Sequence, residues 1–123
     1  MTIINKYIGK IITVTIDRPA GSSHPKYLEI IYPINYGYIN GIIAPDGEEQ
    51  DVYVLGINEP LTTFRGRVIA IIRRKNDVEE KWVVAPEGIC FTDKEILKSV
   101  HFQERFFESY VYMNINNVER KNK

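Results

Sequence analysis

The feature that most constrains this fold is a succession of short segments rich in β-branched residues, with no helical segment between them. In the first of these segments, Ile12, Val14 and Ile16 lie on one face of an extended chain. Short strands at this spacing, without crossover helices, predict a small sandwich or barrel rather than βαβ units. The expected strands are residues 10–16, 28–32, 51–56, 67–73 and 81–85.

The pattern changes near residue 92, where Thr92-Asp93-Lys94-Glu95 fits a capping box. Apolar residues then follow at roughly helical spacing: Ile96, Leu97, Val100, Phe107 and Tyr110. Residues 116–123 are polar and are expected to fray. We therefore expect one domain over residues 1–123, a mainly β closed barrel covered on one side by a C-terminal helix.

Composition excludes several classes of protein. Lys plus Arg and Asp plus Glu each total 16, and this balance disfavours a non-specific nucleic-acid binder, which needs an excess of basic charge. No apolar run reaches membrane-spanning length, and no secretory signal is recognisable, so a cytoplasmic protein without a membrane partner is expected. The single cysteine, Cys90, excludes an internal disulfide and is expected to be a buried, inert thiol between Ile89 and Phe91.

Carboxylates are concentrated in the hexapeptide at residues 46–51. Asp46 and Glu48 leave the same side of an extended backbone, and Asp51 opens the following strand, from which it can point back toward them. Carboxylates gathered in this way repel one another unless a cation lies among them, and three oxygen ligands suit Mg²⁺. The alternative is a solvated turn, because Pro45-Asp46-Gly47 is ordinary turn chemistry.

Three tyrosines precede this hexapeptide. Tyr32, Tyr36 and Tyr38 share parity, so an extended segment would present them on one face, as an aromatic core or a wet barrel surface. Pro33 and Gly37 interrupt the segment and favour a shaped loop wall instead. Phenols and ammonium groups can hold phosphate oxygens. Tyrosines next to clustered carboxylates therefore indicate metal-assisted phosphate chemistry.

A second run of mixed charge lies at residues 76–81, and such runs are usually charged hairpin tips. In a functional interpretation, Asp77 with Glu79 or Glu80 supplies another side of a metal site, and Lys81 faces phosphate. Three further charged residues border the Gly-Ser loop and could complete the site: Asp17, Arg18 and Lys26. Neither histidine has the spacing of a zinc site or a catalytic triad, so we expect both to be structural or exposed: His24 and His101.

Together these motifs resemble those of the soluble inorganic pyrophosphatases over about residues 12 to 110. The tyrosine segment 32–39 followed by residues 46–51 is similar to the family's phenol-bearing segment and its Asp-Gly-Asp-Pro-x-Asp metal motif. The resemblance implies an OB-like barrel that hydrolyses pyrophosphate with Mg²⁺. Further matching segments are Asp17 with 19–27, 81–86 and 106–110.

The resemblance also implies roles for single residues. Asp46, Glu48 and Asp51 would be metal ligands, and Glu48 or Asp51 would orient or deprotonate the attacking water. Asp17 stands at the family's first acidic position. The later acidic positions fall to Asn76 or Asp77, and to Glu79. The phosphate contacts would be Lys26, Tyr36, Lys81 and Tyr110, with Arg18 and Tyr32 as further candidates.

The chain departs from the family pattern at several of these positions. Glu48 is one methylene longer than the family's central Asp, and Glu49 replaces a proline. The segment between Lys26 and Tyr32 is short and lacks a phosphate-binding arginine, and Val111 stands where the family has lysine. The candidates for replacing the lost cations are Arg18, Arg73 and Arg74.

The sequence thus predicts a Mg²⁺-dependent hydrolase of pyrophosphate or a related phosphoanhydride, with a small-molecule substrate and no nucleic-acid partner. One alternative is a catalytically weakened or inactive barrel that binds Mg-pyrophosphate or a nucleotide as a sensor, which the lost cations favour. Another is an oligonucleotide-binding barrel, but the acidic hexapeptide lies where that class needs a basic groove. Three aromatic residues leave room for homo-oligomer formation: Phe102, Phe106 and Tyr112.

Overall fold

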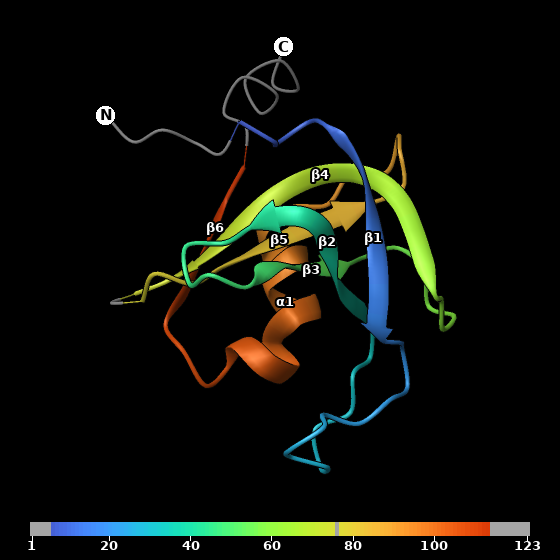
Figure 1. The fold of residues 1–123 in the computed structure, drawn as a ribbon, viewed down its shortest axis with the longest axis vertical. Coiled ribbons are helices and arrows are strands. Elements are labelled where there is room, and N and C mark those ends of the chain that lie inside the picture. Colours follow the sequence, from blue (N-terminus) through green and yellow to red (C-terminus); the bar gives the residue numbers. More distant parts are fainter. Residues whose placement is uncertain (1–5, 76, 114–123) are drawn as a thin grey trace.

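The computed structural model describes residues 6–75 and 77–113, which form six strands and one helix (Figure 1). Residues 116–123, expected to fray, and Asn76 lie outside the described residues. The elements in chain order are β1 (Ile11–Arg18), β2 (Asn35–Ile43), β3 (Glu49–Val54), β4 (Thr63–Arg74), β5 (Glu80–Ala85), α1 (Asp93–Glu104) and β6 (Ser109–Tyr112).

Five strands close into a barrel in the order β1-β2-β3-β5-β4, because β4 also pairs with β1. The closing ladder is antiparallel and runs from Ile11 opposite Arg67 to Thr15 opposite Thr63. Among the strands of the described residues, only β3 and β5 pair in parallel, and β6 adds to the far end of β4. The predicted mainly β closed barrel with one helix is confirmed.

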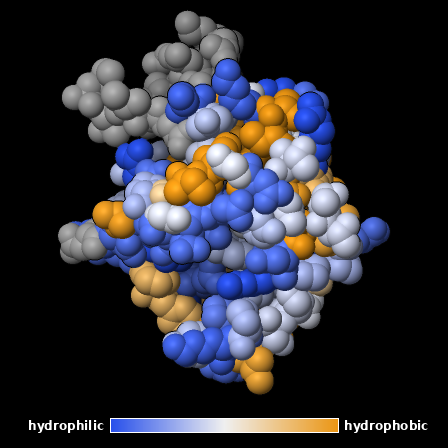
Figure 2. Space-filling view, viewed as in Figure 1, coloured by the Kyte–Doolittle hydropathy of each residue, from blue (hydrophilic) through white to orange (hydrophobic). Residues whose placement is uncertain are grey.

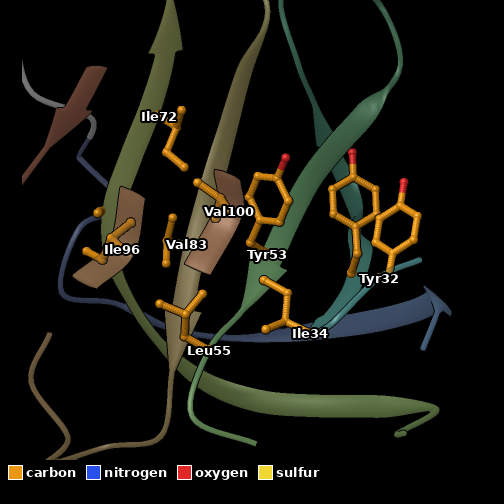
Figure 3. Close-up of a cluster of buried hydrophobic side chains, with 10 residues drawn as sticks. Tyr32, Ile34, Tyr53, Leu55, Ile72, Val83, Ile96 and Val100 are labelled. Carbon is orange, nitrogen blue, oxygen red and sulfur yellow. The ribbon is translucent and has the colours of Figure 1, made fainter. Parts of the chain in front are cut away.

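Side chains alternate between two hydrophobic clusters on opposite faces of the strands. On β3, Val52 and Val54 belong to one cluster, whereas Tyr53 belongs to the other. The second cluster lies under α1, which contributes Ile96 and Val100 (Figure 3). The phenol oxygen of Tyr53 points away from the aliphatic side chains of this cluster (Figure 3). This places polar atoms at one edge of an otherwise apolar contact.

Helix α1 begins as predicted. The Thr92 hydroxyl accepts from the Glu95 amide at 3.1 Å, and the Glu95 carboxylate accepts from the Thr92 amide at 2.8 Å, which is a complete capping box. The helix ends at Glu104, so the expected continuation of the apolar stripe to Phe107 and Tyr110 is wrong. Those two residues lie in the following turn and on β6.

Two other expectations are wrong. Residues 28–32 do not form a strand: apart from one isolated bridge between Ser23 and Ile31, this part of the chain is a long β1–β2 connection beside α1 (Figure 1). Composition alone favoured a strand there, but among residues 6–75 and 77–113 no strand pairs with this segment. Cys90 is exposed rather than buried, because it lies in the connection between β5 and α1.

From Asn35 onward the tyrosine segment becomes β2 rather than a loop wall, whereas Tyr32 precedes the strand. Gly37 makes this possible, since a Cβ on it would lie 1.9 Å from the Thr15 carbonyl oxygen of β1.

No helix among residues 6–75 and 77–113 is long and apolar enough to cross a membrane. On the face seen in Figure 2, hydrophobic residues form small groups among hydrophilic ones.

Candidate active site

A cavity of about 700 Å³ collects most of the buried charge near one side of the barrel. It lies where the long β1–β2 connection and the end of α1 approach the strands. Its charged wall comes from four strands and the β4–β5 turn: Asp17, Arg18, Asp51, Arg74, Glu79 and Lys81.

A β-bulge explains how two consecutive residues of β1 both line the cavity. The register of β1 against β2 shifts between Ile16 and Arg18, so Asp17 is left without a ladder partner. A bulge re-aims side chains that ordinary alternation would send to opposite faces. Asp17 and Arg18 therefore reach the same cavity.

Lys81 is the centre of one polar cluster. Its ammonium group donates to Asp51 Oδ2 at 2.7 Å, to Tyr36 Oη at 2.9 Å and to the Glu79 carboxylate. Burial opposes the charged form, but Tyr36, Asp51 and Glu79 outweigh it and raise the pKa of Lys81. Burial above all also raises the pKa of the Tyr36 phenol, so Tyr36 stays a neutral donor at neutral pH.

Arg74 is the centre of a second cluster. Its Nη2 and Nε atoms donate to the two oxygens of Glu104 at 2.7 and 3.0 Å, and its Nη1 donates to Glu79 at 3.0 Å. The Arg74 and Glu104 side chains are only 6% and 3% exposed. Burial opposes the charge of each group, yet their pairing raises the pKa of Arg74 and lowers that of Glu104. Glu79 joins the two clusters, since it binds both Arg74 and Lys81.

A chain of hydrogen bonds links Arg18 to Glu104 beneath the cavity. Arg18 donates to the Tyr32 hydroxyl, which donates to Gln103 Oε1 at 2.7 Å. Gln103 Nε2 in turn donates to the Tyr53 hydroxyl at 2.7 Å, and that hydroxyl donates to Glu104 at 2.7 Å. The end of α1 thus fixes both arginines of the cavity.

The predicted site residues divide into two groups. Those that line the cavity are Asp17, Arg18, Tyr36, Asp51, Glu79 and Lys81. Those that do not line it are Asp46, Glu48, Asp77, Lys26, Tyr110 and Tyr32. Their roles stay predictions, but the geometry distinguishes the two groups.

The acidic hexapeptide is split by the β2–β3 hairpin. Asp46 and Glu48 are exposed at its tip, where Asp46 Oδ1 accepts from the Glu48 amide at 3.0 Å. Asp51 lies farther along β3 and faces Lys81. In a similar way, Asp77 Oδ1 accepts from the Glu79 amide at 3.0 Å and shapes the β4–β5 turn.

The remaining predicted contacts lie elsewhere. Tyr32 is fully buried, with its hydroxyl in the hydrogen-bond chain. Lys26 is exposed and lies over the Tyr27 ring, and Tyr110 donates to Glu108 on the surface. Of the candidates to replace lost cations, Arg18 and Arg74 line the cavity, whereas Arg73 pairs with Glu80 at 2.8 Å.

Sequence reasoning missed the two polar residues at the end of α1. Gln103 and Glu104 are both buried. Their positions continue the spacing of Ile96 and Val100 on the inner face of the helix. The available signal was that Gln103 and Glu104 stand at the end of the apolar stripe of the helix. Polar residues in such positions are buried, and a buried charge needs a partner, which points to a polar cluster.

The cavity can also be tested for a divalent cation. Among the described residues, no three acidic, histidine or cysteine side chains are grouped as a metal cage. Of the four carboxylates that line the cavity, Asp17 and Asp51 are nevertheless candidates for a shared ion. Burial and the charge of Asp51 raise the pKa of Asp17 against the opposing effect of Arg18, so the two carboxylates interact. Mg²⁺ is typically held by one or two carboxylates together with water and substrate phosphate, and this donor pair fits that ion.

A five-stranded barrel with a charged cavity beside one helix defines a class of protein. Comparisons with known proteins identify the family within that class. The family model described as inorganic pyrophosphatase matches residues 14–122. This chain therefore belongs to the inorganic pyrophosphatase family, as the sequence motifs predicted.

Individual relatives agree with this assignment. The chain is 33% identical over 95 residues to "Soluble inorganic pyrophosphatase 3" of Arabidopsis thaliana, a match that covers 68% of this chain and 44% of that protein. The chain thus spans less than half the length of that curated relative.

Solved structures share the fold at lower identity. The inorganic pyrophosphatase of Ehrlichia chaffeensis has a TM-score of 0.65 at 17% identity, covering 97% of this chain and 95% of its own. The enzyme of Coxiella burnetii has a TM-score of 0.63 at 21% identity, covering 91% of this chain and 89% of its own.

Proposed function

We propose that this chain hydrolyses phosphoanhydride bonds, with inorganic pyrophosphate as the reference substrate and Mg²⁺ as the cofactor. The observation that carries the proposal is the cavity in which Asp17, Asp51 and Lys81 face one another. Membership of the pyrophosphatase family supports the same reaction.

The charge of the cavity supports a requirement for a cation. Four carboxylates line it, from Asp17, Glu29, Asp51 and Glu79, against three cations, from Arg18, Arg74 and Lys81. Burial and Arg18 lower the pKa of His24, so this residue adds no charge at neutral pH. A pyrophosphate anion would therefore enter a site that is already slightly negative, and a divalent cation offsets that repulsion.

Asp17 and Asp51 would hold Mg²⁺. When bound, the ion would neutralise phosphate oxygens and make water a better nucleophile. Lys81 binds Asp51 through Oδ2, which leaves Oδ1 as the oxygen to orient the attacking water and accept its proton. Arg18 and the neutral Tyr36 phenol would donate to the two phosphates, and Lys81 would do so by exchanging one of its three present acceptors for a phosphate oxygen.

A phosphate-release assay with Mg²⁺ and pyrophosphate tests the proposal. We expect turnover by the parent chain, and a loss of about 10²-fold or more in Asp51→Asn, because this change removes a charged oxygen from the reacting centre. Asp46→Asn is the matched variant, since it alters the same residue type in the same hairpin but at the exposed tip. No turnover by the parent, or an unchanged rate in Asp51→Asn, would reject the reaction proposed here.

A second candidate is a non-catalytic barrel that binds Mg-pyrophosphate. It is favoured by the position of Glu48, a predicted catalytic residue, outside the cavity, and by the engagement of Lys81 and Arg74 with carboxylates. Calorimetric binding of Mg-pyrophosphate without phosphate release would select this candidate over the enzyme.

A further inference from the structure

The cavity is larger and more apolar than pyrophosphate requires. The volume of the cavity is about 700 Å³. If each heavy atom of pyrophosphate takes up roughly 30 Å³, the whole anion fills less than half of this volume. Hydration of the anion and its cation accounts for part of the remainder, but one wall of the cavity, made mainly of aromatic and aliphatic side chains, does not suit an ion. That wall consists of His24, Tyr27, Ile30, Phe106 and Phe107.

These aromatic residues are not needed by the hydrophobic core. Tyr27, Phe106 and Phe107 are 48%, 58% and 44% exposed, and none belongs to either buried cluster. They come from two separate segments, the β1–β2 connection and the turn after α1, yet line one cavity. Large exposed rings that converge on a cavity are typical of a ligand surface.

His24 adds a fixed polar group to this wall. Its Nδ1 accepts from the backbone amides of Lys26 and Tyr27 at 3.0 and 3.1 Å, so the proton of the neutral ring lies on Nε2. The ring is also in contact with Tyr27, at a centroid distance of 5.2 Å. Glu29 lines the same cavity with a carboxylate acceptor. The wall therefore offers ring faces together with one donor and one acceptor.

The charged and aromatic walls meet at Arg74. Its guanidinium lies 3.7 Å from the centroid of the Phe107 ring while it binds Glu79 and Glu104. A ligand held by the cations of the cavity would thus have its next atoms beside an aromatic ring. A nucleotide carries a planar base that can stack on such a ring, joined to its phosphate chain through a ribose.

We propose that the substrate of this cavity is a nucleoside di- or triphosphate, with its phosphates on the charged wall formed by Lys81, Arg18 and Arg74 and its base on the aromatic wall. This inference rests on the proposed phosphoanhydride chemistry and specifies the organic group that the substrate carries. An isoprenoid diphosphate fits less well, because its chain has no use for the donor of His24 or the acceptor of Glu29.

Equilibrium binding by calorimetry with Mg²⁺ tests the inference without requiring turnover. The probes are α,β-methylene-ADP, methylenediphosphonate as the analogue that lacks a nucleoside, and geranyl diphosphate. Base stacking on aromatic residues contributes roughly 1–3 kcal/mol, so we expect the ADP analogue to bind at least fivefold more tightly than methylenediphosphonate. Phe106→Ser and Tyr27→Ser should each lower affinity for the ADP analogue at least fivefold more than affinity for methylenediphosphonate.

Leu28→Ser is the matched control, because Leu28 is 67% exposed in the same connection but does not line the cavity. It should change neither affinity, and thermal melting of all three variants checks their folding. An advantage below fivefold over methylenediphosphonate, an equal loss of both ligands in the aromatic variants, or tighter binding of geranyl diphosphate overturns the nucleotide assignment. In these cases pyrophosphate hydrolysis by the parent can still stand. If neither diphosphate analogue binds and pyrophosphate is not hydrolysed, both proposals fail.

Discussion

Glu104→Gln should be the most informative single change for stability, because it removes one charge from a buried ion pair. Glu104 accepts four hydrogen bonds: two from Arg74, one from Tyr53 at 2.7 Å and one from Ser109 at 2.6 Å. A glutamine of nearly the same shape keeps only one acceptor oxygen and places amide hydrogens against donors. The substitution therefore breaks the pair without creating a cavity.

The expected cost follows from this geometry. Removing one partner of a buried ion pair costs about 3–5 kcal/mol, since the other charge stays buried. Arg74 retains Glu79 at 3.0 Å, so we expect the lower end, about 3 kcal/mol. For a domain of this size that corresponds to a decrease in melting temperature of roughly 10–15 °C.

Urea unfolding followed by circular dichroism measures this difference. The matched control is Glu108→Gln, since the Glu108 side chain is 59% exposed and lies 3.8 Å from Lys75. We expect the control to change the free energy of unfolding by less than ~0.5 kcal/mol. A change below ~1 kcal/mol in Glu104→Gln would refute the argument that the pair is broken at a cost.

The dependence on pH gives an independent check. The net effect on Glu104 is a lowered pKa in the folded state, because the donated hydrogen bonds and the charge of Arg74 outweigh its burial. Its contribution to stability is therefore fully present above the unfolded value of about 4.3 and is lost as pH falls through the lower folded value. The difference between parent and Glu104→Gln should accordingly shrink below about pH 4. A difference that stays constant down to pH 2 would assign the effect to packing rather than to charge.

Three further predictions concern other parts of the chain. The pKa of Lys81 is raised in the folded state, so its contribution to stability is present below about pH 10.4 and is lost as pH rises further. The stability of Lys81→Met should therefore fall less at alkaline pH than that of the parent. Urea midpoints from pH 8 to 11 measure this difference. Gly37→Ala should prevent normal pairing of β1 with β2 and cost more than ~3 kcal/mol of stability. Gly41 has a φ of 86° but nothing within 4 Å of an added Cβ, so Gly41→Ala should cost about 1 kcal/mol. Equal melting temperatures of the two variants would contradict this. Thr92→Ala should cost about 1 kcal/mol through loss of the helix cap, with Ser99→Ala, which removes a half-buried hydroxyl from the same helix, as the control. An equal effect of both changes in urea unfolding would count against the cap.

Much of the fold could be predicted because its signals are local. Alternating apolar residues identified β1, β3, β4 and β5 to within a few residues, and the capping box gave the start of α1. The strand expected at residues 28–32 failed for a non-local reason. That segment has the composition of a strand, but only a partner decides whether its backbone groups pair, and the β1–β2 connection provides one isolated bridge.

The candidate site could be predicted only in part, for a related reason. Tyr36, Asp51 and Lys81, which line the cavity, were predicted as site residues because each belongs to a recognisable motif. The hexapeptide was expected to act as a unit, yet the hairpin separates its members: an extended chain rises about 3.3 Å per residue, so the tip lies well away from Asp51. The pairing of Arg74 with Glu104 joins residues 30 positions apart, so the local sequence around Glu104 could indicate a buried charge but not its partner.

The hydrogen-bond chain under the cavity explains why these distant residues must be of these types. Every donor in it points the same way, from the Arg18 cation through Tyr32, Gln103 and Tyr53 to the Glu104 carboxylate. In such a series a hydroxyl accepts one hydrogen bond and donates another through the same oxygen. The central position, Gln103, needs an acceptor and a donor on separate atoms, which a side-chain amide provides. A glutamate there would present no donor to Tyr53, and a leucine would remove both the acceptor for the Tyr32 hydroxyl and the donor to the Tyr53 hydroxyl. Because aligned hydrogen bonds polarise one another, the charges at the two ends fix the direction of the whole series. The two arginines of the cavity are therefore positioned by one connected network rather than by separate contacts.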